Sequence, residues 1–135
     1  MGGSGPGGGG GISGKAASKL MDQIKGSGGF SYQVVTRTAP KGGYMVSPYK
    51  DREHVLNAKV ASMRDLIRYT SRNKDLLSRP DHYFGGWMDK DSLYLDSSVR
   101  HAERATALDA AKKGGQLAIF DVEKMDSIYL EGGAN

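Results

Sequence analysis

The chain has 135 residues, 20 of them glycine, and a formal net charge of +4. It contains no cysteine, which excludes disulfides, thiolate metal sites and cysteine nucleophiles. No apolar run approaches the roughly 18 residues that span a bilayer, and no basic segment followed by an apolar one marks a signal peptide, so we expect neither a membrane partner nor secretion by this route.

Charge is distributed unevenly along the chain. Residues 1–79 hold 13 Lys and Arg against 5 Asp and Glu, a net charge of +8, whereas residues 80–135 hold 6 against 10, a net charge of −4. This asymmetry favours an anionic partner for the first part, or head-to-tail association, although a basic excess also serves solubility alone. The partners to consider are therefore another protein, a second copy of the chain, or nucleic acid.

The first 29 residues hold 12 of the glycines and predict a flexible arm. Glycine loses more conformational freedom on folding than any other residue, and residues 1–11 offer almost no apolar surface in return. The same tract also resembles an engineered linker. Within the arm, residues 12–25 place Ala16, Leu20 and Ile24 at helical spacing, which predicts a short amphipathic helix.

Two interpretations of this arm helix stay open. A short helix on two glycine tethers is typical of a segment that folds onto a protein partner. The candidate contacts of such a docking arm are Ile12, Lys15, Lys19, Leu20 and Ile24. Alternatively, the helix packs on its own domain, because the entropy cost of closing a loop rises slowly with tether length.

Residues 30–131 are predicted to form one α+β domain. Alternating residues over 30–37 and a resumed pattern over 44–49 indicate two strands, joined by a Pro-Gly turn into an antiparallel hairpin. Residues 56–73 then follow helical spacing, and the apolar side of this helix is expected to carry Leu56, Val60, Met63, Ile67 and Thr70.

The second half of the domain predicts a central hairpin, a helix and two further strands. The hairpin covers residues 83–96, and Ser97 or Ser98 caps a helix over residues 99–113. A buried strand over 116–122 and an edge strand over 127–130 complete the order β-β-α-β-β-α-β-β. The expected fold is thus a small antiparallel sheet with two helices on one face, preceded by the flexible arm.

Arginines at i, i+4, i+8 give the strongest signal for a partner. Arg64, Arg68 and Arg72 would lie along one helix face and could follow a line of phosphates or carboxylates. The alternative is a solvated face with local ion pairs, since Asp65 and Arg68, or Arg72 and Asp75, have i, i+3 spacing.

Tyr83 and Trp87 flank a Gly-Gly pair and form a second candidate, an aromatic surface for a ligand. The simpler interpretation is that the single Trp is a core or half-buried anchor. The three histidines, His54, His82 and His101, stand in no catalytic or metal-binding spacing, so catalytic residues stay unassigned and no metal or cofactor is expected.

Residues 83–121 resemble small, uncharacterised domains of bacteriophage and other mobile-element proteins, often joined to virion proteins. The matching residues are Gly86-Trp87, Leu93-Tyr94-Leu95-Asp96, Ser97-Ser98, Glu103, Ala107 and the run Gln116-Leu117-Ala118-Ile119-Phe120-Asp121. The resemblance is a hydrophobic framework and implies a fold and a viral source, without transferring any catalytic residue.

Two functions follow from these patterns. The first is a non-enzymatic, phage-type accessory or virion-associated protein that docks on a protein partner through its arm, in the host cytoplasm or in the virus particle. The second is a small nucleic-acid-binding protein, or a nuclease-like effector, that uses the arginine face with His54 or His82.

Overall fold

A computed structural model describes residues 11–130, so the first glycine tract of the predicted arm, residues 1–10, lies outside the described residues. The described chain is α+β, as the sequence predicts. Its elements, in order, are α1 (Gly14–Ser27), β1 (Gly29–Tyr32), β2 (Tyr44–Val46), the 3-10 helix η2 (Lys50–Arg52), β3 (His54–Asn57), α2 (Met63–Arg72), α3 (Lys74–Leu77), β4 (His82–Asp89), β5 (Ser92–His101), α4 (Arg104–Lys113), β6 (Ala118–Asp121) and β7 (Asp126–Tyr129).

The β4–β5 hairpin forms the middle of a curled antiparallel sheet. The strand order is β1-β4-β5-β2-β6-β7, and β3 also pairs with β5. β5 is long enough to hold two strands in succession on one edge, with β3 along residues 92–95 and β2 along residues 99–101. The predicted central hairpin is therefore confirmed, and it is longer at both open ends than the sequence pattern indicated.

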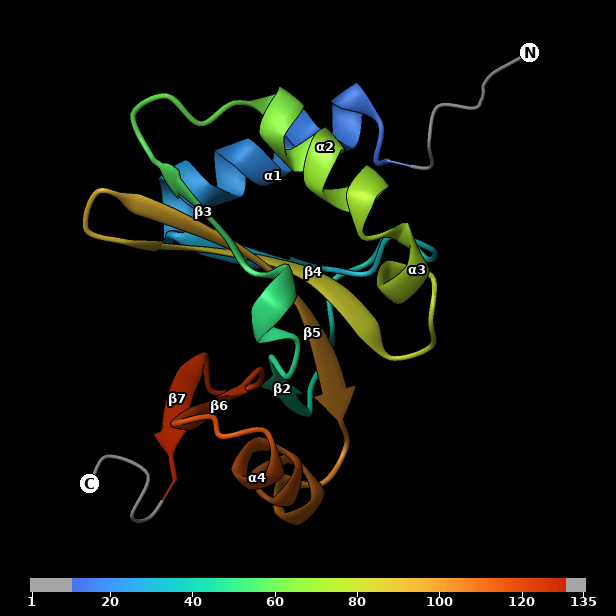
Figure 1. Cartoon of the computed structure of the whole chain (residues 1–135), viewed down its shortest axis with the longest axis vertical. Coiled ribbons are helices and arrows are strands. Elements are labelled where there is room, and N and C mark those ends of the chain that lie inside the picture. The colour runs from blue at the N-terminus through green and yellow to red at the C-terminus, as the bar shows by residue number, and fades with distance from the viewer. Residues whose placement is uncertain (1–10, 131–135) are drawn as a thin grey trace.

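Helices α1 and α2 lie side by side over one face of this sheet (Figure 1). The ring of Phe84 on β4 sits at the centre of the core beneath them, stacked on Tyr69 of α2 at 5.3 Å and edge-on to Phe30 of β1 at 4.9 Å. Aliphatic side chains from α1, α2, α3 and β5 belong to the same cluster: Leu20, Ile24, Leu66, Leu77, Leu93 and Leu95.

A second, smaller apolar cluster lies at the other end of the molecule, where α4 covers β2 and the β6–β7 hairpin (Figure 1). Its buried members are Val46, Ala107, Ala111 and Ile119. The alanines let the helix approach the strands closely. The pairing of β6 with β7 confirms the two strands predicted near the C-terminus.

The predicted arm helix packs on its own domain. Ile12, Leu20 and Ile24 are buried in the main core, whereas Lys15 and Lys19 on the other side of α1 are exposed. Ser13 caps the helix by accepting a hydrogen bond from the backbone N–H of Ala16. Residues 11–27 thus belong to the folded unit, and three of the predicted docking side chains are not available to a partner.

The two strands near the start of the domain do not form the predicted hairpin. β1 pairs with β4, while β2 pairs with β5 and β6 on the other side of the sheet. The segment between them turns back on itself at a bridge between Gln33 and Thr38, with Arg37 at φ 60. The hairpin was predicted because β1 and β2 are close in the sequence. Each strand instead pairs with a strand of the central hairpin, β1 with β4 and β2 with β5.

The helix predicted over residues 56–73 begins seven residues later. Residues 54–57 are β3 instead, paired with β5, because a strand edge was available to them and Val55 and Leu56 suit a half-buried sheet. A capping box of Ser62 and Asp65 then starts α2. Of the predicted apolar side, Thr70 is buried as expected, whereas Val60 and Met63 are exposed. Leu66 and Tyr69 are the other buried residues of α2.

The helix predicted over residues 99–113 is also shorter at its N-terminus. Ser97 and Ser98 are buried within β5 and do not act as caps; the residue before the first turn of α4 is Glu103. Val99 pairs with both Val46 of β2 and His82 of β4, so the strand continues past the expected boundary.

Replacing Leu20 by Ala tests whether α1 is part of the core. Leu20 is 2% exposed, and the change should lower the free energy of unfolding in urea by about 2–4 kcal/mol through lost burial and a cavity. The exposed neighbour variant Lys19→Ala should change it by less than about 0.5 kcal/mol. Equal stability of the two variants would contradict the packing described for α1.

Candidate nucleic-acid interface

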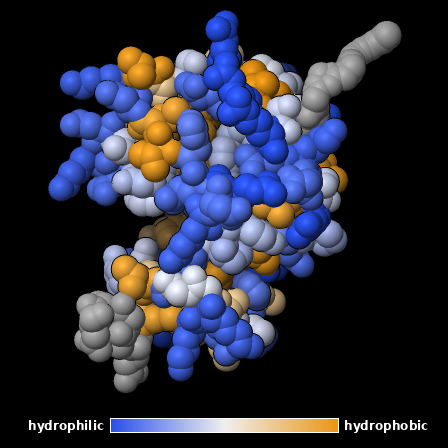
Figure 2. All heavy atoms as spheres, in the orientation of Figure 1, coloured by the Kyte–Doolittle hydropathy of each residue, from blue (hydrophilic) through white to orange (hydrophobic). Residues whose placement is uncertain are grey.

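The exposed sides of α1 and α2 form one basic area, which we call the helix surface. Because α1 and α2 each turn an apolar side toward the sheet, the residues opposite face solvent. The helix surface consists of Lys15, Lys19, Arg64, Arg68 and Arg72, all exposed. Hydrophilic side chains project from this part of the molecule in Figure 2. The structure thus joins two groups of cations that the sequence analysis assigned to different partners.

None of these five cations forms an ion pair with a described residue. Within residues 11–130, the ion pairs join Arg52 to Asp51 and Asp75, and Lys113 to Asp109. The carboxylates on the two helices are Asp22 and Asp65, so the helix surface together with them carries five positive and two negative charges, a net of +3. A free surface cation keeps its full attraction for an anionic ligand.

The local ion pairs proposed for the arginine face do not form, because both acidic partners are engaged elsewhere. Asp65 accepts a hydrogen bond from the backbone N–H of Ser62 at 2.8 Å and from its hydroxyl at 3.3 Å. Asp75 binds the guanidinium of Arg52 through two parallel hydrogen bonds of 3.0 and 2.9 Å. That guanidinium holds the pKa of Asp75 below its usual range.

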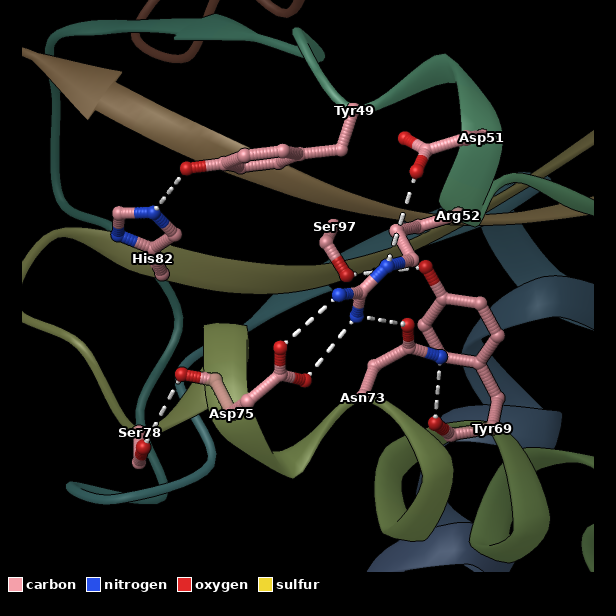
Figure 3. A network of polar contacts seen from close by, with 9 residues as sticks. All are labelled: Tyr49, Asp51, Arg52, Tyr69, Asn73, Asp75, Ser78, His82 and Ser97. Atoms are coloured by element: carbon pink, nitrogen blue, oxygen red, sulfur yellow. Dashed lines mark hydrogen bonds and ion pairs between the residues drawn. The ribbon is translucent and has the colours of Figure 1, made fainter.

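An open cleft of about 770 Å³ borders the helix surface, between α2–α3 and the segment of η2 and β3. Arg68 and Arg72 line it together with Arg52 and His54. Figure 3 shows how the cleft wall is fixed: Arg52 also donates to Asn73, whose side-chain amide donates to the backbone oxygen of Tyr69. The bidentate pair with Asp75 therefore holds η2 against α3, and the bond to Asn73 holds it against the end of α2.

The hydroxyl of Tyr69 continues this network into the core. It lies 2.9 Å from the hydroxyl of Ser97, and burial raises the pKa of Tyr69 above its ordinary value. The hydroxyl of Tyr69 thus has a hydrogen-bond partner on β5, and its ring packs on Phe84. Its place is structural: it links the cleft wall to the centre of the sheet.

Two of the three histidines differ sharply in their surroundings. Both ring nitrogens of His82 have partners, the hydroxyl of Tyr49 at 2.8 Å and the backbone oxygen of Pro80 at 2.8 Å. His54 is exposed on the cleft wall near Arg68 and Arg72. No group of three metal-ligating side chains occurs among the described residues.

The exposed aromatic surface consists of Trp87 and Tyr94, and not of Trp87 and Tyr83 as predicted. Tyr83 is buried, whereas Trp87 is 42% exposed and stacks on Tyr94, its partner across the β4–β5 hairpin. The ring centroids of Trp87 and Tyr94 lie 4.2 Å apart, with 8° between the ring planes. Trp87 is therefore a surface residue on the sheet and does not anchor the core.

A buried carboxylate lies beside this aromatic pair. Asp96 is 8% exposed and accepts a hydrogen bond from the Ser47 hydroxyl at 3.0 Å. A methyl group at Gly85, its register partner, would lie 2.3 Å from Asp96 Oδ1, so only glycine fits there. Burial raises the pKa of Asp96 to about 6, the Ser47 hydrogen bond opposes the rise, and the charge of Glu53 adds to it.

Sequence reasoning missed Tyr94, Asp96 and Arg52 as members of a site. Tyr94 could have been found from strand alternation, since it lies opposite Trp87 when the hairpin turn is placed at residues 90 and 91. Asp96 could have been noticed because it is an acidic residue in an otherwise apolar strand. Arg52 gave no signal, because the residues that accept its side-chain hydrogen bonds, Asn73 and Asp75, lie more than 20 residues away in the sequence.

Comparisons with known proteins identify no relative: no family model matches the chain, and neither the curated proteins nor the solved structures contain a significant match. Among residues 11–130, no helix has the length and apolar character needed to cross a membrane.

Replacing Asp96 by Asn tests the buried carboxylate. Because the folded protein holds the Asp96 proton more tightly than the unfolded chain, with pKa values of about 6 and 3.8, the wild type should lose stability relative to the variant as pH rises from 4 to 7. The difference between their free energies of unfolding should change by up to about 3 kcal/mol. Urea unfolding at several pH values measures it, and a pH-independent difference would contradict the assignment.

Proposed function

We propose that this protein binds nucleic acid through the helix surface. The observation that carries the proposal is the set of five exposed cations on α1 and α2 without ion-pair partners in residues 11–130. The acidic residues that would most easily neutralise them, Asp65 and Asp75, are held by Ser62 and Arg52. A polyanion is the ligand that gains most from such a surface, since each phosphate bound releases condensed counterions.

The spacing of the arginines suits a phosphate backbone. Residues Arg64 and Arg72 are separated by eight positions, which corresponds to roughly 12 Å along a helix axis. Guanidinium groups bind phosphate through two hydrogen bonds at once. Three arginines in this arrangement, with Lys15 and Lys19 on the adjacent helix, can contact several consecutive phosphates. The net charge of +8 over residues 1–79 adds long-range attraction for the same ligand.

The phage-type accessory role stays a prediction from the resemblance of residues 83–121, and nucleic-acid binding is compatible with it. Docking on a protein through the apolar side of the arm helix is not part of the proposal, because Ile12, Leu20 and Ile24 are buried in the core. Lys15 and Lys19 are instead assigned to the surface that binds nucleic acid. No catalytic step is proposed for His54.

Removing the arginines tests this function. The triple variant Arg64→Ala/Arg68→Ala/Arg72→Ala should bind a labelled oligonucleotide more weakly than the wild type at low salt, since three phosphate contacts are lost. The slope of log affinity against log salt, measured by fluorescence anisotropy between about 50 and 200 mM NaCl, should fall by roughly 2 to 3. Circular dichroism should show an unchanged fold, because all three side chains are exposed.

A matched control removes the same charge elsewhere. Arg104, Lys112 and Lys124 are exposed, lie near α4 and the β6–β7 turn, and form no ion pair within residues 11–130. Their triple alanine variant should retain most of the affinity of the wild type. Equal losses in the two variants would mean that net charge alone governs binding, and failure of the wild type to bind any oligonucleotide would overturn the proposal.

A further inference from the structure

The exposed Trp87–Tyr94 pair lies on the face of the sheet opposite the helix layer. Side chains alternate along a strand, and Phe84 points toward α2, where it stacks on Tyr69. Gly86 faces the same side, since a methyl group there would meet the ring of Phe30. Trp87 therefore points away from α1 and α2.

Strand register places a side chain against only one side of the Trp87 ring. Across four strands the register aligns Gly29 of β1, Trp87 of β4, Tyr94 of β5 and Val55 of β3. One ring face of Trp87 is covered by Tyr94, at 4.2 Å. On the other side its neighbour is Gly29, which has no side chain to cover the indole. The pair thus leaves aromatic surface accessible, in agreement with the exposed fraction of Trp87.

The indole also has a buried carboxylate nearby. Burial raises the pKa of Asp96, Trp87 opposes the rise, and the hydroxyl of Ser47 donates a hydrogen bond of 3.0 Å to the same carboxylate. Gly85 provides the room that this carboxylate needs. A ring stacked on Tyr94 loses little conformational freedom when a ligand stacks on it, which favours binding.

The C-terminal end of α1 reaches the edge of the sheet beside Trp87. α1 ends at Ser27, Gly28 turns the chain with φ 89, and Gly29 begins β1 beside Trp87. The backbone oxygen of Gly28 accepts the N–H of Met88, the residue after Trp87. Lys25, exposed in the last turn of α1, extends the positive charge toward this edge.

We propose that Trp87, with Tyr94 behind it, stacks on an unpaired base, and that the nucleic acid bound by this protein is single-stranded. This inference rests on the proposed function. Positively charged surface next to an exposed aromatic ring is the combination with which proteins hold single strands, because every base has a flat face to stack. A duplex keeps its base faces covered by neighbouring pairs, so the ring adds nothing to duplex binding.

Fluorescence tests the inference directly because Trp87 is the only tryptophan in the chain. Titrating the wild-type protein with an oligothymidine of about 12 nucleotides should quench the emission of Trp87 and protect it from acrylamide. The change should saturate at the concentration at which anisotropy reports binding. This measurement needs no variant, so it does not depend on how a substitution folds.

Variants then separate stacking from charge. Trp87→Leu should weaken single-strand binding by about tenfold or more and leave duplex binding at the wild-type level. The control Tyr129→Leu removes an aromatic side chain that is 72% exposed on β7, and it should change neither. The salt slope of Trp87→Leu should equal that of the wild type, because no phosphate contact is lost.

The outcomes distinguish the inference from the function on which it rests. Single-strand binding with unchanged Trp87 emission and normal affinity in Trp87→Leu would overturn the stacking site and leave the helix surface as the binding element. Equal affinity of the wild type for single strands and duplex would also overturn it. Absence of binding to either nucleic acid would overturn both the inference and the proposed function.

Discussion

Burial of the apolar side of α1 is the interaction on which both the core and the surface charge of this protein depend. Leu20 and Ile24 cover Phe30 and Phe84 on the sheet, and Ile12 reaches α2, where its backbone N–H donates to Thr70 at 3.0 Å. Without α1, one face of the central hairpin would lose part of its helical cover. Once α1 is buried in this way, its lysines necessarily face solvent beside the arginines of α2.

The arginines of α2 lack ion pairs because the nearest carboxylates bind other groups. Asp75 could have neutralised Arg72 on the neighbouring turn, but it binds Arg52 and so joins η2 to α3 across the cleft. Asp65 could have paired with Arg68, but it satisfies the N-terminus of α2. Both carboxylates therefore contribute to the fold, and neither forms an ion pair with Arg64, Arg68 or Arg72. The resulting excess of positive charge is the basis of the proposed function.

Local patterns in the sequence predicted the fold class and the elements whose partners are near in the chain. The hairpins β4–β5 and β6–β7 belong to this group, since a turn joins their strands directly. Predictions failed where distant pairing decides the structure. β3 occupies residues that follow helical spacing, because the edge of β5 offers them hydrogen bonds, and β1 pairs with a strand more than 50 residues away.

The candidate site could be predicted in part, and the limit has the same physical origin. The spacing of Arg64, Arg68 and Arg72 predicted a basic helix face, which is present and exposed. That Lys15 and Lys19 lie on the same surface could not be predicted, because it depends on how α1 packs. The role of Asp96 could not be predicted either. Its contact with Gly85 depends on the register of β4 and β5, and Ser47 lies 49 residues away in the sequence.

Amide NMR spectra recorded during titration with a single-stranded oligonucleotide test the central claim most directly, because they locate the bound ligand without altering any residue. The account predicts that shifts concentrate in α1, α2 and the part of the sheet around residues 85–95, and that α4, β6 and β7 stay unchanged. Shifts concentrated in α4, β6 and β7, with α1 and α2 unchanged, would contradict it.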